Sequence, residues 1–435
     1  MVLAAASTRC FRTPAVYRPR HPRATPLYGL MELYYDKVKA EWEDRFERTY
    51  GYWRGFVDRV VWRYLDCGIP EAGFARVFCD QCKDEYLLPF SCKCRAICPS
   101  CDAKRAAVFA AFLKDELLED VCHAQWVFTL PKMLRPYFLY HRELLGQLCR
   151  AAYETVEELM MAAVEDKDFR PGMVGVIQTF AQTLRWNPHI HALATRGGWN
   201  ARGQWIPVPY IDAHQAELLF RHKVFKLLKN DGLLSDERIE LLMSWRHTGF
   251  SVDNSIIVYP SDEKGLERLA RYMIRSPVNL QTLHYLPQTQ QVFYQTNKGH
   301  DPEDSEIIDS MEFVARVLMH VPELNKPYIH HYGIYSNRSQ HKPRKDSIFP
   351  EATQNEEPPS ISGSKLRRRW ANLIRRVYQT DPLICPKCGS KMRILSFITQ
   401  PRVINKILEH LKNRATQTRA PHTPKLQQAP LPLFP

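Results

Sequence analysis

Apolar residues in the first part of the chain recur with the spacing of helices. Between Met31 and Leu65 large apolar side chains return at every fourth position, which places them on one helical face: Tyr34, Val38, Trp42 and Phe46. Residues 1–29 lack this pattern and are rich in proline and arginine, so we expect an arm there. A further helical pattern, Ala103–Leu118, follows a segment rich in cysteine.

Strand and helix patterns alternate through the middle of the chain. Short runs rich in β-branched and aromatic residues predict four strands and a hairpin: His123–Leu130, Met173–Phe180, His189–Ala194, Ser255–Tyr259, and Thr282–Tyr285 with Val292–Gln295. Longer amphipathic stretches predict helices at Tyr140–Glu165, His214–Lys229 and Asp262–Arg275. We expect a turn at Trp186–Pro188. This irregular order predicts an α+β fold, in which helices cover the faces of a sheet.

Changes of pattern divide the chain into five predicted segments. They are an arm with a helical segment (1–70), a cysteine module (71–108), a core (109–340), a linker rich in proline and serine (341–365) and a basic C-terminal region (366–435). Within the last segment we expect a basic helix at Leu366–Tyr378 and a disordered tail from about Thr416.

Charge is distributed unevenly along the chain. The formal net charge is +13, and residues 365–435 hold 15 Lys and Arg against two acids, so this segment carries the whole excess. Such a segment favours a polyanionic partner, although a solvated tail with no specific role has the same composition. Apolar runs such as Ala106–Leu113 are far shorter than the roughly 18–20 residues that cross a bilayer. We therefore expect a soluble protein with no membrane partner.

Twelve cysteines are present, and most lie in or beside Cys-x-x-Cys pairs. In a reducing compartment such pairs indicate metal binding rather than disulfides. Two pairs separated by 15 residues predict one tetrahedral structural zinc site with four ligands: Cys79, Cys82, Cys98 and Cys101. Cys92 and Cys94 lie between the pairs, so a ligand exchange remains open. Cys385 and Cys388 form half of a possible second zinc site.

Basic residues surround these cysteines and also follow the linker. We expect them to contact DNA phosphates: Lys93, Arg95, Lys104, Arg105, Arg367, Arg368 and Arg369.

Two histidines, His189 and His191, are candidates for binding a catalytic cation. Residues two apart on a strand point to the same face, so the two imidazoles would lie side by side with Ile190 on the opposite face. Two imidazoles and a third ligand can hold a divalent cation that polarises a phosphate oxygen. Taken alone, the triplet equally fits two ordinary strand histidines.

The predicted helix at Asp262–Arg275 adds a candidate nucleophile. Arg268, Tyr272 and Arg275 are spaced by four and three residues and share a stripe of that helix. A phenol is a weak nucleophile near neutral pH, and adjacent guanidinium groups would favour its phenolate and hold a phosphodiester. The alternative is a tyrosine packed among arginines with no catalytic role.

Together these motifs resemble rolling-circle insertion-sequence transposases of the IS-ninety-one type, members of the HUH (His-hydrophobic-His) endonuclease superfamily. The resemblance covers most of the chain and depends on several segments: Gly73–Arg76, Ser91–Lys93, Cys98–Cys101, Asn187–Ala192, Leu269–Arg275, Tyr332–Arg338 and Asp381–Gly389. It implies an antiparallel-centred sheet with flanking helices, preceded by the zinc module and followed by the basic extension.

The resemblance also implies a reaction. Mg²⁺ or Mn²⁺ on His189 and His191 would activate a phosphate of single-stranded DNA, and Tyr272 would attack it to leave a 5′-phosphotyrosine and a 3′-hydroxyl. The substrates would be the element ends and the target DNA, with host replication proteins as further partners. No motif fixes the third metal ligand, for which we select Gln178 on the preceding strand.

One position departs from the family pattern. Founding members carry a second tyrosine four residues before the nucleophile, where this chain has Arg268, which indicates a single-tyrosine variant. Tyr332 and Tyr335 are alternative nucleophiles. Two other classes compete: a non-catalytic zinc-dependent DNA-binding protein from a decayed element, and a zinc hydrolase, for which the usual His-Glu-x-x-His motif is missing.

Overall fold

The computed structural model describes residues 21–295, 305–336 and 383–417. The chain divides into two units, each discontinuous in sequence. Unit 1 comprises residues 1–65 and 92–382, and unit 2 comprises residues 66–91 and 383–435. This division differs from the contiguous cysteine module 71–108 expected from the sequence. The physical reason is strand pairing, because the strand that opens the module forms a sheet with a strand from the C-terminal region.

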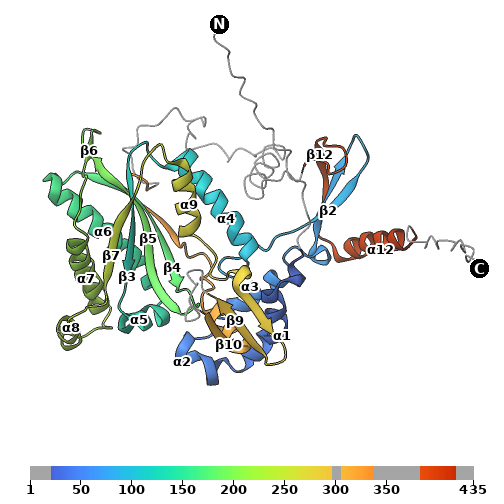
Figure 1. The fold of residues 1–435 in the computed structure, drawn as a ribbon, viewed down its shortest axis with the longest axis horizontal. Coiled ribbons are helices and arrows are strands. Elements are labelled where there is room, and N and C mark those ends of the chain that lie inside the picture. Colours follow the sequence, from blue (N-terminus) through green and yellow to red (C-terminus); the bar gives the residue numbers. More distant parts are fainter. Residues whose placement is uncertain (1–20, 296–304, 337–382, 418–435) are drawn as a thin grey trace, which may run out of the picture. The chain divides into compact units, whose positions relative to one another are not determined.

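The described part of unit 1 contains an antiparallel six-stranded sheet in the order β11-β4-β5-β3-β7, with β6 paired to β5 (Figure 1). Its strands are β3 (His123–Thr129), β4 (Arg170–Phe180), β5 (Trp186–Trp199), β6 (Trp205–Pro207), β7 (Ser251–Val258) and β11 (Ile329–Gly333). The α+β fold with an antiparallel-centred sheet is therefore confirmed. The long strands β4 and β5 are buried over nearly their whole length.

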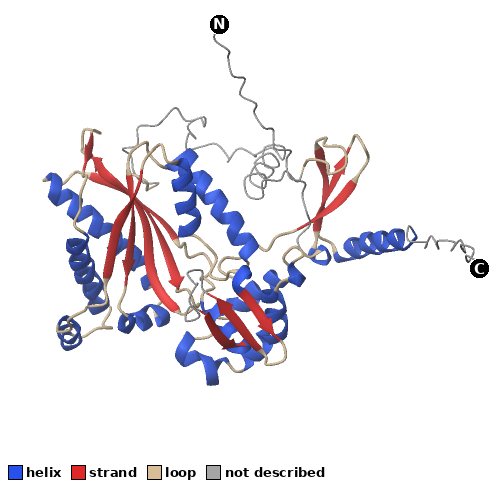
Figure 2. Cartoon of the chain, viewed as in Figure 1, coloured by secondary structure: helices blue, strands red, loops and turns tan. Residues whose placement is uncertain are grey.

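Helices cover both faces of this sheet (Figure 2). One face packs against four helices: α5 (Arg135–Tyr140), α6 (Leu144–Val164), α7 (Ala213–Asn230) and α8 (Asp236–Met243). The strands contribute the buried side chains of Trp126, Phe128, Ile177 and Ile190 to this layer. The other packs against α4 (Pro99–Phe112), the π-helical turn Leu113–Leu117 and α9 (Glu263–Met273). Because α9 buries Leu269, Ala270 and Met273 against the sheet, its remaining side chains face outward.

A smaller layer in unit 1 holds the N-terminal helices. These are α1 (Pro26–Ala40), a π-helical turn (Trp42–Phe46), α2 (Glu47–Tyr50) and α3 (Phe56–Leu65). The α1 helix packs against α10 (Ser310–Met319) and against a three-stranded sheet of β8 (Leu283–Leu286), β9 (Gln291–Gln295) and β10 (Ser305–Asp309). The expected apolar face is buried, but the helix breaks at Gly51, whose positive φ of 82° ends α2.

Unit 2 contains a three-stranded antiparallel sheet in the order β12-β1-β2. Its strands are β1 (Phe74–Cys79), β2 (Glu85–Pro89) and β12 (Met392–Ile398), followed by α12 (Pro401–Gln417). Neither β12 nor α12 was predicted. The strands β1 and β2 were also not predicted, and no local pattern shows that segments more than 300 residues apart pair with each other.

One further prediction is wrong, and several others fall outside the described residues. The predicted turn at Trp186–Pro188 is wrong: β5 begins at Trp186, and the turn lies at Ala181–Arg185, where Leu184 has a φ of 59°. The linker 341–365, the basic helix Leu366–Tyr378 and most of the tail from Thr416 lie outside the described residues. Within the described ranges, the helices are too short or too polar to span a membrane.

Candidate functional site

The histidine pair lies on β5, on the sheet face that α4 and α9 cover. Ile190 is fully buried against the opposite helical layer, whereas Leu193 packs with α4 and α9. Because side chains alternate along a strand, His189 and His191 share the face of Leu193. Both imidazoles are buried, at 8% and 3% exposure.

The geometry of the two imidazoles suits a shared cation. Their Nε2 atoms are 3.2 Å apart. His189 Nδ1 lies 2.7 Å from the Asn187 carbonyl oxygen, which can only accept, so Nδ1 carries the proton and Nε2 presents a lone pair. Burial lowers the pKa of His189 to about 4 and that of His191 to about 3, which keeps both rings neutral at pH 7. A neutral imidazole with a free Nε2 is the form that binds metals.

Gln178 lies on β4 directly opposite His189 in the strand register. Its Nε2 donates to the carbonyl oxygens of Met273, at 2.7 Å, and Tyr272, at 3.1 Å, at the C-terminal end of α9. Its Oε1 is buried and accepts no hydrogen bond from any described residue. The amide nitrogen of Gln178 thus ties the end of α9 to the sheet, and its oxygen is left without a donor.

A second glutamine near the pair was missed by the sequence analysis. Gln125 on β3 is buried, and its side-chain amide lies 3.4 Å from His191 Nδ1. The assignment of oxygen and nitrogen in such an amide follows from its partners. With its oxygen toward Nδ1–H, Gln125 would orient the ring and leave Nε2 open for a cation. Gln125 lies two residues after His123 on the same strand, so both side chains point to the same face of the sheet. This alternation was the signal in the sequence that could have identified Gln125.

Tyr272 reaches the same site from α9. Its ring centroid lies 5.2 Å from that of His191 in an edge-on arrangement, and its side chain is 44% exposed. The Arg275 guanidinium stands 4.7 Å above the Tyr272 ring and 5.4 Å from that of Phe180. Arg268 lies one turn earlier on α9 and is exposed. The structure therefore brings Tyr272, Arg275 and the histidines together, with Arg268 at the solvent side of α9.

The two alternative tyrosines occupy different environments. Tyr332 packs with α6 on the opposite face of the sheet, where it stacks on Tyr153 at 4.8 Å. Tyr335 is 2% exposed, and its hydroxyl lies 2.6 Å from His123 Nε2. Burial raises the pKa of both phenols well above the ordinary range. Neither arrangement suits a nucleophile that must meet DNA.

The structure does not bring the four expected zinc ligands into one group. Cys79 and Cys82 belong to unit 2, and Cys98 and Cys101 belong to unit 1. In unit 2 the ligand atoms of four cysteines lie within 4.8 Å of one another: Cys79, Cys82, Cys385 and Cys388. The closest sulfur pairs are Cys79–Cys388 at 3.5 Å and Cys82–Cys385 at 3.4 Å. The half-site at Cys385–Cys388 is thus completed by the first Cys-x-x-Cys pair of the chain, Cys79 and Cys82. We call each such pair with its turn a knuckle.

The two knuckles of this cluster have the same backbone design. Cys79 N donates to Asp84 O and Lys83 N donates to Cys79 O, at 2.8 and 3.0 Å. Cys385 N donates to Ser390 O and Gly389 N donates to Cys385 O at the same two distances. The residue four beyond each first cysteine has a positive φ, 61° at Lys83 and 72° at Gly389. Such matched turns aim two thiolates from each knuckle at one point.

Ion pairs also join the two knuckles. Lys387 contacts Asp84 at 2.7 Å, Arg393 contacts Asp80 at 2.8 Å, and Ser390 donates to Gln81 at 2.9 Å. These contacts link the β1–β2 turn to the segment before β12 and to the start of β12 itself.

The second predicted pair, Cys98 and Cys101, lies beside Cys92 rather than beside Cys79 and Cys82. Cys92, Cys98 and Cys101 are buried and belong to one group of closely spaced thiols, with the Cys92 and Cys101 sulfurs 3.5 Å apart. Cys94 Sγ instead contacts the Val60 and Cys92 carbonyl oxygens. The ligand exchange left open by the sequence therefore involves Cys92.

The basic residues expected to contact DNA divide into three sets. Arg95 donates to the Glu323 and Lys326 carbonyl oxygens, and Arg105 donates to Asp102 and to the Lys93 carbonyl oxygen, so both have structural contacts. Lys93 is exposed and Lys104 is half-buried. Arg367, Arg368 and Arg369 lie outside the described residues.

Two family models and two relatives match this chain. Residues 172–343 match a family model described as a putative transposase, and residues 37–130 match one described as a transposase zinc-binding domain. The chain is 26% identical over 355 residues to the transposase for insertion sequence element IS801 of Pseudomonas savastanoi pv. phaseolicola, covering 77% of this chain and 82% of that protein. It is 27% identical over 279 residues to the putative transposase y4qJ of Sinorhizobium fredii (strain NBRC 101917 / NGR234), covering 60% and 69%. No solved structure gives a significant match.

Proposed function

This chain belongs to the insertion-sequence transposases of the IS-ninety-one type, and from that premise we propose that it nicks single-stranded DNA through attack by Tyr272. The observation that carries the proposal is the edge-on contact of Tyr272 with His191, beside two Nε2 atoms that face each other at 3.2 Å. Three residues from two elements, β5 and α9, thus meet at one partly exposed point.

Each residue has a role in the proposed reaction. His189, His191 and the Gln178 side-chain oxygen would hold Mg²⁺ or Mn²⁺, which when bound polarises a non-bridging oxygen of the phosphate. Arg275 stands over the Tyr272 ring, where its positive charge favours the phenolate and attracts the phosphodiester. Gln178 also fixes the end of α9 through its two bonds to backbone carbonyls.

The covalent step then balances as a transesterification. The Tyr272 phenol oxygen forms a bond to phosphorus as its proton passes to solvent, which reaches its 44% exposed side chain. The bond from phosphorus to the 3′ oxygen of the preceding nucleotide breaks, and that oxygen takes up a proton. The products are a 5′-phosphotyrosine and a free 3′-hydroxyl. A relay of two tyrosines on α9 is absent from this scheme because Arg268 occupies the second position.

The substrates in this proposal are the single-stranded ends of the element and the target strand. Host replication proteins would extend the free 3′-hydroxyl. The alternative, a zinc-dependent DNA-binding protein without catalysis, would leave the contact between Tyr272 and His191 without a role.

The experiment uses the full-length protein, Mg²⁺ and an end-labelled single-stranded oligonucleotide that carries the element end. We expect a protein–DNA adduct that holds only the 3′ fragment, and a released fragment ending in a 3′-hydroxyl. Tyr272→Phe should abolish the adduct while DNA binding persists. Tyr259→Phe changes an exposed tyrosine away from the histidines and is the matched control. Binding without cleavage in the wild type would instead support the DNA-binding alternative.

We further propose that zinc binds to both cysteine groups and acts structurally. Four thiolates at Cys79, Cys82, Cys385 and Cys388 satisfy a closed tetrahedral site. In unit 1, the buried Cys92, Cys98 and Cys101 supply three thiolates of the second group.

A further inference from the structure

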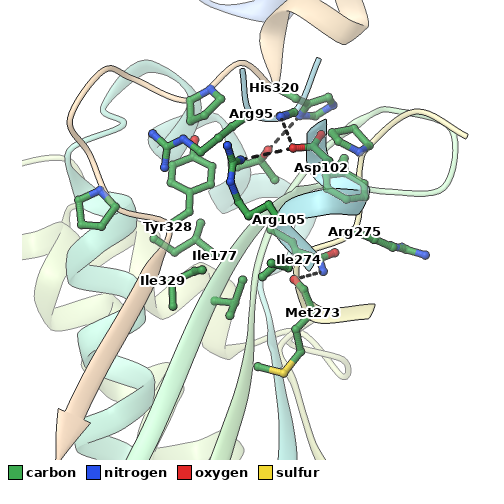
Figure 3. A pocket seen from close by; sticks show the side chains of 18 residues that line it. Arg95, Asp102, Arg105, Ile177, Met273, Ile274, Arg275, His320, Tyr328 and Ile329 are labelled. Atoms are coloured by element: carbon green, nitrogen blue, oxygen red, sulfur yellow. Dashed lines mark hydrogen bonds and ion pairs between the residues drawn. The ribbon is translucent and has the colours of Figure 1, made fainter. Parts of the chain in front are cut away.

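A pocket of about 300 Å³ lies in unit 1, and Asp102, Arg275 and Tyr328 are among the residues that line it (Figure 3). It shares Gln178 and Arg275 with the proposed nicking site. Its other walls come from the first turns of α4, the end of β4, and the segment from His320 to Ile329. This volume is at the lower end of the range for small-molecule sites and suits one flat ring system rather than a folded peptide.

The walls of the pocket are suited to stacking. Tyr328, Phe180 and His320 contribute rings, and the prolines at 277, 322 and 327 contribute flat apolar edges. The Arg95 guanidinium lies 5.6 Å from the Tyr328 ring centroid, and Arg275 lies over Phe180. Nucleic-acid bases bind proteins by stacking on aromatic rings and on arginine planes.

One carboxylate in the wall has an unused oxygen. Asp102 is 4% exposed, and its Oδ1 accepts from Ala96 N at 3.3 Å and from Arg105 Nη1 at 3.4 Å. Its Oδ2 is buried and accepts no hydrogen bond from the described part of the chain. A buried carboxylate oxygen without a donor is costly, so such an atom in a pocket wall indicates a ligand that donates. Arg275 Nε is also buried without a partner among the described residues.

The charge of the pocket fits a nucleotide better than a free anion. Arg95, Arg105 and Arg275 give three positive charges against the one carboxylate of Asp102. The excess attracts a phosphodiester backbone, whereas Asp102 would repel an anion that entered the pocket itself. A base presents hydrogen-bond donors while its phosphates stay outside.

We propose that this pocket holds one unstacked base of the DNA strand next to the scissile phosphate and selects a base whose exocyclic amino group donates to Asp102. The inference rests on the proposed function for the position of the strand, since Gln178 and Arg275 border both sites. The base stacks on Tyr328, and Asp102 Oδ2 reads its amino group. This makes Asp102 a specificity-determining residue outside the reaction itself.

The test exchanges the donor and acceptor pattern of the pocket. Full-length wild type and Asp102→Asn are each incubated with a randomised single-stranded pool, and the bound and the nicked molecules are sequenced separately. Asn keeps the Oδ1 acceptor and can place an NH₂ group at the position of Oδ2. We expect wild type to prefer an amino-bearing base about ten-fold at one position, and the variant to prefer a carbonyl-bearing base there. Glu116→Gln, an exposed carboxylate beyond α4, should keep the wild-type preference.

A change in the DNA keeps the test independent of protein folding. Once the position is known, the selected base is replaced by its analogue without the amino group. Binding to wild type should weaken about ten-fold, and Asp102→Asn should lose this discrimination. Equal binding of both oligonucleotides to wild type would overturn the proposal even if the variant failed to fold.

The outcomes separate this inference from the proposed function. Nicking by wild type with identical base preferences in wild type and Asp102→Asn would refute the pocket assignment and leave Tyr272 catalysis intact. Absence of nicking, with a base preference among bound molecules that changes in Asp102→Asn, would refute the proposed reaction and support the base pocket.

Discussion

Two glutamines have different positions around the histidine pair. Gln178 faces His189 across the β4–β5 register and has an unpartnered Oε1, whereas Gln125 contacts His191 Nδ1. The first fits a metal ligand, and the second fits a residue that orients a ligand. The sequence analysis selected Gln178 from its strand position. The alternation His123-Ala-Gln125 shows only which face of β3 carries Gln125, and the β3–β5 register is needed to place it beside His191.

We predict different effects from substituting the two glutamines. Gln125→Leu should weaken Mn²⁺ binding about 10- to 100-fold and retain the maximal nicking rate at saturating metal, because an orienting partner is lost. Gln178→Leu should weaken Mn²⁺ binding and also lower the rate at saturation, because α9 loses its anchor as well. Titration of nicking with Mn²⁺ measures both effects. Identical titration curves for the two variants would contradict the distinction.

A buried histidine predicts an acid-sensitive fold. His320 is fully buried between Thr179 and the Leu184 carbonyl oxygen, and burial lowers its pKa from 6.5 to about 3. A group with a lowered folded-state pKa stabilises the fold above its unfolded value and loses this contribution as pH falls. The wild type should therefore lose stability between about pH 6.5 and pH 3, and His320→Gln should lose less over that interval. Urea unfolding at several pH values measures the difference, and equal slopes would exclude His320 as a cause.

At the scale of elements, the sequence predicted local patterns well and long-range pairing poorly. The amphipathic pattern of α9 was readable because the period of burial matches the period of the helix. The strands β4 and β5 are buried on both faces and were readable as short runs rich in β-branched and other apolar residues. The pairing of β1 with β12 was not readable, since it joins residues such as Phe74 and Ile398. For the same reason each Cys-x-x-Cys knuckle was visible, whereas the assignment of Cys79 and Cys82 to Cys385 and Cys388 was not.

The new cysteine grouping predicts which substitutions release zinc. Cys385→Ser and Cys82→Ser should each lower the zinc content by one ion per chain and destabilise unit 2, because metal binding and folding are coupled in small sites. Cys122→Ser changes a cysteine outside both groups and is the control. Elemental analysis of the purified proteins measures the content. A full complement of zinc in Cys385→Ser would favour the contiguous set that includes Cys98 and Cys101.

At the scale of the whole molecule, charge and metal binding share the C-terminal region. The basic excess of the chain lies in residues 365–435, and the same segment contributes Cys385 and Cys388 to the cluster of unit 2. Deleting the segment would thus remove positive charge and half a metal site together. Point substitutions that remove charge alone give the clearer test.

We predict that Arg367→Gln, Arg368→Gln and Arg369→Gln combined flatten the salt dependence of DNA binding. Each lost phosphate contact should reduce the slope of log affinity against log salt by roughly 0.7 for a single strand. Zinc content should stay unchanged, which separates this effect from loss of the cluster. A slope equal to that of wild type would show that these arginines do not contact phosphates.

The central claim is that Tyr272 becomes joined to DNA, and mass spectrometry of the adduct tests it most directly. After nicking, the DNA is trimmed with nuclease and the protein is digested with trypsin, which cuts after Arg271 and Arg275. The account predicts a nucleotide mass on the peptide 272–275 through a phosphotyrosine bond. A nucleotide mass on a peptide that carries Tyr332 or Tyr335, or nicked DNA with no modified peptide, would contradict it.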